Sequence, residues 1–348
     1  MASEMCKLRP MFPLLLWVTI AIFMILFYLS TNPGGKSSEI LTLGNEIHTI
    51  TIHQKVNETR KIRAKEVNIT MTSPAIEEEF QDFLSLVRRV AMDDNTVILT
   101  EVNEAFAAPG SLLDAFLESF RVGKDIQHLL NHVIIVAMDV KAFDRCKSLH
   151  PHCYLLKIPG VSLNSEKVFM SKDYIELVWT KVKLQRLIIE SGYNFLFTDV
   201  DIMWFRNPLR YISVYADLTL GSDNFTGDPE DWKNNAPNTG LVYIKSTKKN
   251  AEMLKYWHQA RERFPPINEQ LVFDYIKHEL VGMFNLRIQF VDTAYWGGFC
   301  QPKKDFNKIC TFHGTCIIGL EAKLHYLRIV LEEWKRFIAS SASNFPGS

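Results

Sequence analysis

Two aspartates, Asp199 and Asp201, stand one residue apart directly after the apolar run 193–198. Such a run is typical of a strand in the middle of a sheet, so the pair lies where the backbone leaves that sheet. Two carboxylates at this spacing can both reach one hard cation, directly or through water. Because Mg²⁺ and Mn²⁺ prefer such oxygen ligands and bridge them to phosphate oxygens, the sequence predicts a divalent metal site that holds a phosphate-bearing ligand.

The same tripeptide has two other interpretations. A D-x-D pattern arises by chance, so the pair can also be an acidic, solvated turn. The aspartyl-phosphate phosphatase pattern, D-x-D-x-Thr/Val, does not fit, because Met203 occupies its last position and the pair follows the fourth expected strand rather than the first. The position at a strand end favours the metal site.

Further polar residues are expected near the same edge of the sheet. The segment 238–240 (Asn-Thr-Gly) is typical of a turn before a strand at 241–244, and Asn238 can present its amide to a sugar hydroxyl. Glu269 and Gln270 begin the helical pattern 271–277, where an acid also simply favours the helix dipole.

Three more polar side chains are candidates for the same site. Lys181 and Arg186 lie on the helix that leads into the acidic pair, where a cation would neutralise a diphosphate; the alternative is a solvated face. His313 lies in an expected loop among cysteines, where a histidine is a metal ligand or a structural residue. Trp204, Phe205 and Trp296 are expected in the core, with stacking on a base or sugar as the alternative.

Strand and helix signals alternate through the segment that positions these residues. Strands are expected at 96–100, 132–139, 153–158 and 193–198, and helices at 111–123, after 139 to 150, and at 171–192. The first helix begins at a capping box, Ser111 with Asp114, and ends at Gly123. The alternation predicts an α/β sheet with crossover helices, whose ligands bind beyond the carboxyl ends of the strands.

Composition narrows the class of protein. Of 348 residues 47% are hydrophobic, which excludes a mostly disordered or low-complexity chain. Lys+Arg and Asp+Glu number 39 each, so the formal net charge is zero and the basic surface of a nucleic-acid-binding protein is absent. We therefore expect no nucleic acid among the partners.

The N-terminal region is expected to anchor the protein in a membrane. Residues 11–29 carry no charge and are long enough to span about 30 Å of hydrocarbon as a helix. Lys7 and Arg9 precede them, which predicts a cytosolic tail at 1–10 and a lumenal remainder; a cleaved signal peptide is the alternative. A polar stem follows at 30–91, with a short helix around 76–90. Sequons in the lumenal part predict glycosylation at Asn57, Asn68 and Asn224.

Five cysteines follow the expected anchor, so at least one stays unpaired within the chain. An oxidising lumen makes structural disulfides plausible. The nearest partners are Cys146 with Cys153 and Cys310 with Cys316, although sequence alone does not settle the pairing.

Four segments together resemble the plant nucleotide-diphospho-sugar transferase family (glycosyltransferase family 77). They are 197–208 (FTDVDIMWFRNP), 103–114 (NEAFAAPGSLLD), 145–153 (RCKSLHPHC) and 293–300 (TAYWGGFC). The resemblance spans about 92–340, which marks a catalytic domain and leaves a short tail at 341–348. It implies a GT-A-like, Rossmann-type mixed sheet flanked by helices, in a single-pass type II Golgi membrane protein.

The resemblance also implies an activity. Family members use a UDP-sugar donor with Mn²⁺ (or Mg²⁺) and retain the anomeric configuration. Those that work on the cell wall transfer a pentose, xylose or arabinose, to pectic polysaccharide or hydroxyproline-rich glycoprotein. The alternatives from other classes are a catalytically inactive lumenal scaffold of the same fold and a secreted carbohydrate-binding protein.

The family pattern assigns roles to individual residues. Asp199 and Asp201 match the acidic pair that holds metal and diphosphate, following Thr198 in the donor site, and His313 matches a further metal ligand. Asn238 matches a residue beside the donor. Glu269-Gln270 stands where relatives usually have Asp-Gln; a retaining reaction needs a carboxylate nucleophile or same-face attack. Gln270 fits the second route as a polarising group, and Glu269 can contact donor hydroxyls.

The chain departs from the family pattern at three positions. Glu269 replaces the usual Asp, Thr239 replaces a Gly, and Ile317 stands where relatives usually carry a second, adjacent cysteine. These changes bear on the identity of the donor and on one disulfide.

Overall fold

The computed structural model describes residues 80–156 and 172–343. The chain divides into two units, Met1–Glu66 and Val67–Ser348, and every described residue belongs to the second. The expected membrane segment 11–29 and the sequons at Asn57 and Asn68 lie outside the described residues. Among the helices that the structure does describe, none is both long and apolar enough to cross a bilayer.

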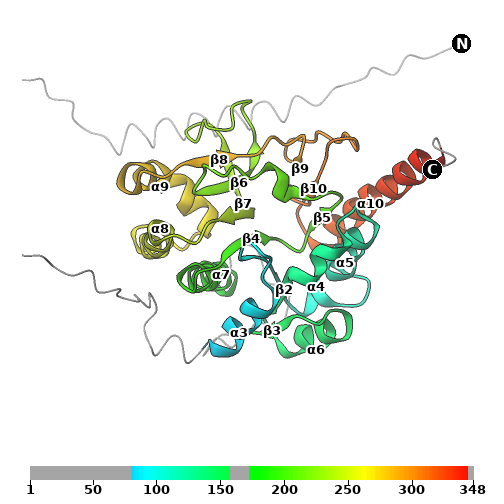
Figure 1. The fold of residues 1–348 in the computed structure, drawn as a ribbon, viewed down its shortest axis with the longest axis horizontal. Coiled ribbons are helices and arrows are strands. Elements are labelled where there is room, and N and C mark those ends of the chain that lie inside the picture. The colour runs from blue at the N-terminus through cyan, green and yellow to red at the C-terminus, as the bar shows by residue number, and fades with distance from the viewer. Residues whose placement is uncertain (1–79, 157–171, 344–348) are drawn as a thin grey trace, which may run out of the picture. The chain divides into compact units, whose positions relative to one another are not determined.

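A mixed seven-stranded sheet forms the centre of the unit, in the order β3-β2-β1-β4-β7-β6-β8 (Figure 1). Its strands are β1 (Thr96–Val102), β2 (Val133–Ala137), β3 (Cys153–Leu155), β4 (Asn194–Thr198), β6 (Leu218–Asn224), β7 (Ala236–Ile244) and β8 (Ile288–Phe290). Strands β3, β2, β1 and β4 are parallel, β7 runs antiparallel to both β4 and β6, and β6 is parallel to β8. The expected mixed α/β sheet is confirmed.

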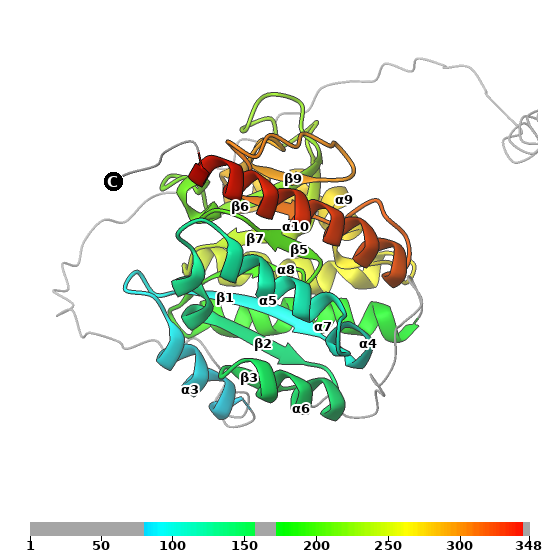
Figure 2. The ribbon, with the colours of Figure 1, turned by 90° about the vertical axis from the view of Figure 1, so that its right-hand side faces the viewer.

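Alternate residues of the strands feed two hydrophobic cores, one on each face of the sheet. In β1, Val97 and Leu99 belong to one core, whereas Ile98 and Val102 belong to the other. The first core packs against α3, α7, α8 and α9, and the second against α5, α6 and α10 (Figures 1 and 2). The helices are α3 (Gln81–Val90), α4 (Glu104–Ala107), α5 (Leu112–Val122), α6 (Val140–Leu149), α7 (Lys172–Glu190), α8 (Lys248–Ala260), α9 (Glu269–Phe284) and α10 (Leu320–Ser343), with 3₁₀ turns η1 (Gln127–His132), η2 (Pro208–Tyr211) and η3 (Arg261–Arg263).

A second, three-stranded sheet lies beside the carboxyl end of β4, in the order β5-β10-β9. It consists of β5 (Ile202–Trp204), β9 (Trp296–Gly298) and β10 (Thr311–His313). Strand β10 is antiparallel to β5, with His313 opposite Ile202. This pairing brings a segment more than 100 residues downstream next to the acidic pair.

Two local expectations need adjustment. Ser111 is the N-cap residue of α5, but its hydroxyl donates to the carbonyl of Ala105 rather than capping the helix, and Asp114 accepts instead from the amide of Gly110. Helix α3 falls within the expected stem, yet its apolar face is buried in the first core. The folded unit therefore begins no later than Gln81.

One of the two nearest-neighbour disulfides is confirmed and the other is wrong. Cys146 pairs with Cys153, whereas Cys316 pairs with Cys300 and leaves Cys310 free and buried. Strand β10 runs between Cys310 and Cys316. Because an extended strand advances about 3.3 Å per residue, these two cysteines are separated by more than a disulfide can span.

Candidate active site

The turn after β4 presents the two aspartates. The amide of Asp199 donates to the carbonyl of Gly240 (2.7 Å), and Ile202 closes the turn by donating to the carbonyl of Asp199 (3.2 Å). Thr198 is buried, and its hydroxyl accepts from the indole nitrogen of Trp204 (3.2 Å). The end of β4 is thus tied to β5, so the turn between them is fixed by both sheets.

His313 completes a group of three potential metal ligands. Its Nε2 lies 3.1 Å from Asp201 Oδ1 and 3.5 Å from Asp199 Oδ2. One ligand atom from each of the three side chains lies within 4.8 Å of the others. The expected loop around His313 is wrong, because this residue ends strand β10, and its pairing with β5 is what aims the imidazole at the acidic pair.

The backbone leaves room for this group only because residue 240 is glycine. A Cβ at Gly240 would lie 2.3 Å from Asp199 Oδ2 and 2.5 Å from His313 Cε1. Two carboxylates and one imidazole around a bare stretch of backbone form a donor set that fits a divalent cation. Asp199, Asp201 and His313 are therefore the residues that would hold it.

A lysine from the last helix reaches the same carboxylates. Lys323 Nζ lies 2.6 Å from Asp201 Oδ2. Burial alone would raise the pKa of Asp201, but the charges of His313 and Lys323 hold it well below its usual range. Burial raises the pKa of Asp199, with Lys181 acting in the opposite direction. Burial would lower the pKa of His313, yet Asp201 raises it above its ordinary value.

Lys181 and Glu269 form a second cluster of charged side chains, which is more deeply buried than the potential metal ligands. Lys181 Nζ contacts Glu269 Oε1 at 2.5 Å, and both side chains are almost wholly buried. Thr239 donates its hydroxyl to the same Glu269 oxygen (3.1 Å). Burial would lower the pKa of Lys181, but Glu269, Asp199 and Glu101 together raise it. The lysine therefore stays charged as the counter-ion of Glu269.

Glu101 is a carboxylate at the end of β1 that sequence reasoning missed. Its Oε1 is buried and has no hydrogen-bond partner among the residues that the structure describes, and burial raises the pKa of Glu101 to about 8. The chain runs from β1 through β2 to β3 on one side of β1, whereas β4 lies on the other side. Open α/β sheets bind ligands near such a switch point, so a ligand is expected at the carboxyl ends of β1 and β4.

Asn238 and Gln270 meet at a third carboxylate, Asp223. Asn238 Nδ2 donates to Asp223 Oδ1 (2.8 Å), and Gln270 Nε2 approaches Asp223 Oδ2 (3.4 Å). Gln270 Oε1 accepts from the amide of Thr239 (2.9 Å). The turn expected at 238–240 is wrong, because these residues lie inside β7. The pairing of β7 with β4 and β6 holds them at the site edge.

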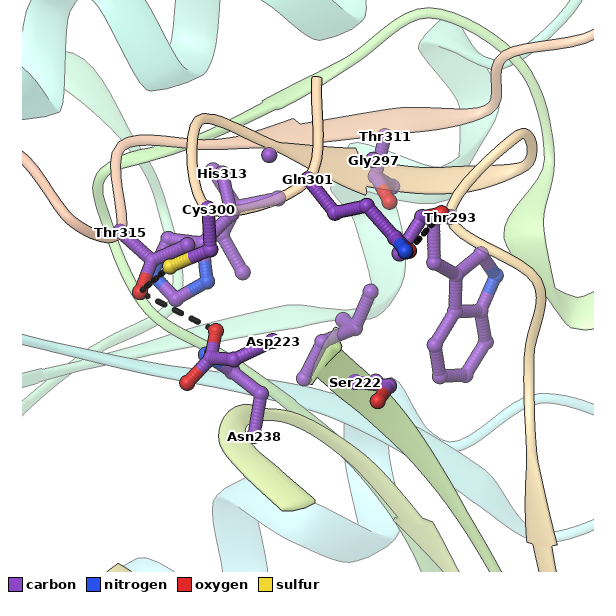
Figure 3. A pocket seen from close by; sticks show the side chains of 15 residues that line it. Ser222, Asp223, Asn238, Thr293, Gly297, Cys300, Gln301, Thr311, His313 and Thr315 are labelled. Atoms are coloured by element: carbon purple, nitrogen blue, oxygen red, sulfur yellow. Dashed lines mark hydrogen bonds between the residues drawn. The ribbon is translucent and has the colours of Figure 1, made fainter. Parts of the chain in front are cut away.

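A pocket opens beside the three ligands, between the two sheets (Figure 3). His313 and Asn238 line this pocket. The pocket is therefore directly adjacent to the metal group, by which we mean Asp199, Asp201 and His313. In Figure 3, Asp223 and Asn238 lie on one side of the pocket and Gln301 and Thr293 on the opposite side, and a dashed line joins Thr315 to Asp223. The described lining consists of Ile202, Gly221, Ser222, Asp223, Asn238, Leu241, Thr293, Trp296, Gly297, Gly298, Cys300, Gln301, Thr311, His313 and Thr315.

The structure brings the residues expected at the donor and metal site together, except for Arg186. Arg186 pairs with Glu190 four residues along α7 (2.7 Å), and none of its contacts in the described residues links it to the metal group. The aromatic residues Trp204 and Phe205 are core, whereas Trp296 is buried and also lines the pocket. Lys323, Asp223 and Glu101 are the residues that sequence reasoning missed. The position of Asp223 and Glu101 near strand ends was the available signal.

Comparison with known proteins assigns the family. A family model described as nucleotide-diphospho-sugar transferase matches residues 128–327, more than half of the chain. The chain belongs to this family. The resemblance seen in the sequence is therefore confirmed. All three potential metal ligands lie within the matched residues.

Several proteins of Arabidopsis thaliana are similar to this chain. Two uncharacterized proteins are 34% and 35% identical over 267 and 269 residues, covering 76% and 75% of this chain and 70% and 79% of their own. A UDP-D-xylose:L-fucose alpha-1,3-D-xylosyltransferase is 20% identical over 344 residues, covering 91% of this chain and 86% of its own.

Proposed function

We propose that the protein is a metal-dependent glycosyltransferase that moves a sugar from a UDP-sugar to a carbohydrate or glycoprotein acceptor. The observation that carries the proposal is the convergence of Asp199, Asp201 and His313 at the carboxyl end of β4 in a chain of this family. These three residues would hold a divalent cation, for which we propose Mn²⁺, and its positive charge would stabilise the departing diphosphate.

The chain's own residues have distinct tasks in this proposal. Lys323, paired with Asp201, supplies a positive charge beside the leaving diphosphate. The oxygen of the acceptor hydroxyl forms the new bond to the anomeric carbon, UDP leaves with the electron pair of the bond that breaks, and the hydroxyl proton passes to the departing phosphate oxygen on the same face. For a retaining reaction by same-face attack, Gln270 polarises the reacting groups and does not itself attack the sugar. Its carboxamide is held by Thr239, which favours that passive role.

The donor is proposed to be a UDP-pentose. One relative is named for its use of UDP-D-xylose and L-fucose, and another is named an arabinosyltransferase. We therefore propose xylose or arabinose as the transferred sugar and a cell-wall polysaccharide or glycoprotein as the acceptor.

The cellular setting is part of the same proposal. We propose a type II Golgi membrane protein with an anchor at 11–29, a lumenal stem and glycans on Asn57, Asn68 and Asn224. Asn224 is exposed at the end of β6, where a glycan has access. Endoglycosidase treatment of the native protein should lower its mass. A native N-terminus near Ser30 would instead indicate a cleaved signal peptide.

UDP release tests the activity. The full-length protein is incubated with UDP-xylose, UDP-arabinose, UDP-galactose and UDP-glucose, with Mn²⁺, with Mg²⁺ or with EDTA. We expect cation-dependent release of UDP from one donor, and its loss in Asp199→Ala/Asp201→Ala. Asp144→Asn, which changes an exposed aspartate paired with Lys147, is the matched control. Failure to release UDP from every donor, together with failure to bind UDP with any cation, would favour the inactive scaffold.

A further inference from the structure

The pocket beside the metal group holds one carboxylate that the proposed function has not used, Asp223. Strand β6 is antiparallel to β7, which is antiparallel to β4, so β6 and β4 run in the same direction. Their carboxyl ends therefore meet at one edge of the sheet. Asp223 lies near that end of β6, as Asp199 directly follows β4. Asn238, on the strand β7 that lies between them, donates to Asp223.

The contacts of Asp223 leave one of its oxygens available. Oδ1 accepts from Asn238 Nδ2 at 2.8 Å and from Thr315 Oγ1 at 3.3 Å. Oδ2 has a single long contact among the described residues, 3.4 Å from Gln270 Nε2. A carboxylate oxygen accepts two hydrogen bonds, so Oδ2 can still take a donor from a ligand. The side chain is only partly buried, which leaves it open to the pocket.

The other acid near the donor is engaged elsewhere. Glu269 is buried, ion-paired with Lys181 at 2.5 Å and bonded to the hydroxyl of Thr239. Its charge is therefore compensated beneath the sheet. Of these two acids, Asp223 is the one whose partners are all neutral and which lines the pocket.

The chemistry of the pocket indicates its occupant. Among the described lining residues the charged or chargeable side chains are Asp223 and His313, and no lysine or arginine is present. Hydroxyl, amide and indole groups make up most of the remaining polar lining. Such a lining suits a neutral ring that carries hydroxyl groups. Because the transferred sugar would be bonded to a diphosphate at the metal group, it is the first ring that can reach the opening of this pocket.

We infer that Asp223 binds a hydroxyl group of the transferred sugar, whose ring lies at the opening of the pocket next to Asp199, Asp201 and His313. This rests on the proposed function. Asn238, Thr315 and Gln270 orient the carboxylate, and the sugar hydroxyl donates to Oδ2. Asp223 therefore contributes to recognition of the sugar but not of UDP.

Calorimetric binding of UDP and of a UDP-sugar separates these contributions. The donor is whichever of UDP-xylose, UDP-arabinose, UDP-galactose or UDP-glucose the full-length protein hydrolyses fastest with Mn²⁺. For Asp223→Asn we expect the Kd of UDP to stay within about twofold, while affinity for the UDP-sugar and its hydrolysis fall about ten- to a hundredfold. Asp223→Ala should show the same changes in UDP and UDP-sugar binding as Asp223→Asn. Asp228→Asn, which changes an exposed aspartate in the connection between β6 and β7, should change neither affinity.

Three results would overturn the inference or its premise. If both Asp223 variants weaken UDP and UDP-sugar equally, Asp223 supports the fold of the site and does not bind the sugar. If they leave the UDP-sugar unaffected, the sugar lies elsewhere. If the unaltered protein binds no UDP with any divalent cation, the proposed function itself fails. Intact UDP binding by the variants also shows that they are folded.

Discussion

Lys323 Nζ lies 2.6 Å from Asp201 Oδ2, so a residue of the last helix holds one of the carboxylates that follow β4. Burial would lower the pKa of Lys323, but Asp201 and Asp199 raise it above its ordinary value, and the lysine stays charged. A fixed positive charge beside the proposed cation repels that cation and attracts a diphosphate. The charge of Lys323 therefore weakens cation binding and strengthens diphosphate binding, so the two effects can be measured separately.

Replacement of this lysine should therefore change two affinities in opposite directions. We expect Lys323→Met to bind Mn²⁺ alone several-fold more tightly, and to bind UDP at saturating Mn²⁺ about tenfold more weakly, since a charge-assisted contact is lost. Titration calorimetry measures both. Lys335→Met, on the same helix but paired with Glu332 and Glu118, is the control. Parallel changes in the two affinities would contradict this assignment.

Gly240 should be essential to the metal group but not to the fold. The Cβ of Gly240→Ala would overlap Asp199 Oδ2 and His313 Cε1. Both are ends of side chains, so the strain is relieved by turning them away, which dismantles the ligand set while β7 stays paired. We expect at least a tenfold loss of Mn²⁺ affinity with a small change in Tm.

The control for this change is another glycine. Gly282 lies on the exposed side of α9, and a Cβ there meets nothing within 4 Å. Gly282→Ala should raise stability by about 0.5–1 kcal/mol, because alanine favours a helix, and leave Mn²⁺ binding unchanged. Unaltered Mn²⁺ binding by Gly240→Ala would show that the cation does not lie at this group.

The sequence predicts those parts of the fold and site that depend on local pattern. Apolar runs located β1 and β4, and the buried face of α7, which includes Val178 and Val182, followed the helical period. The spacing of Asp199 and Asp201 at a strand end predicted two of the three residues that could hold a divalent cation. The rule that ligands bind at the carboxyl ends of strands could also have identified Asp223, which lies near such an end.

The errors arise where distant segments determine the local structure. Small polar residues at 238–240 favour a turn, but pairing of β7 with two neighbours overrides that preference. Strand β10 is three residues long, too short to give a pattern, and exists because β5 and β9 flank it. No local signal could place Lys323 at Asp201, because that contact spans 122 residues.

The buried pair of Lys181 and Glu269 should stabilise the fold strongly. Removing one partner leaves a buried charge without compensation, so Lys181→Met should lower the free energy of unfolding by about 3–5 kcal/mol. Adding Glu269→Gln should recover part of the loss. Urea unfolding measures both. Lys141 and Glu104 form an ion pair of similar length (2.6 Å) that is exposed, so Lys141→Met should change the free energy of unfolding far less. Similar costs for the two lysines would refute the role of burial.

The Cys300–Cys316 disulfide should affect both stability and the site. It joins the end of β9 to the loop that follows His313, and Thr315 on that loop contacts Asp223. Cys300→Ser/Cys316→Ser should lose about 3 kcal/mol of stability and also weaken Mn²⁺ and donor binding. Cys146→Ser/Cys153→Ser, which opens a shorter loop between α6 and β3, should lose slightly less stability and keep binding unchanged. Equal effects of both pairs on binding would argue against positioning by Cys300–Cys316.

His258 should make the fold sensitive to mild acid. Burial lowers its pKa to about 4, helped by Lys183, Arg261 and Arg186, and its ring lies edge-on to Trp179. An unfolded chain takes up this proton near pH 6.5, so the unfolded state binds more protons between about pH 4 and 6.5, and stability falls as pH drops through that window. We expect His258→Gln to reduce the fall in Tm between pH 7 and 5, while His325→Gln, at an exposed position on α10, does not. An unchanged pH profile in His258→Gln would mean that other groups cause the acid sensitivity.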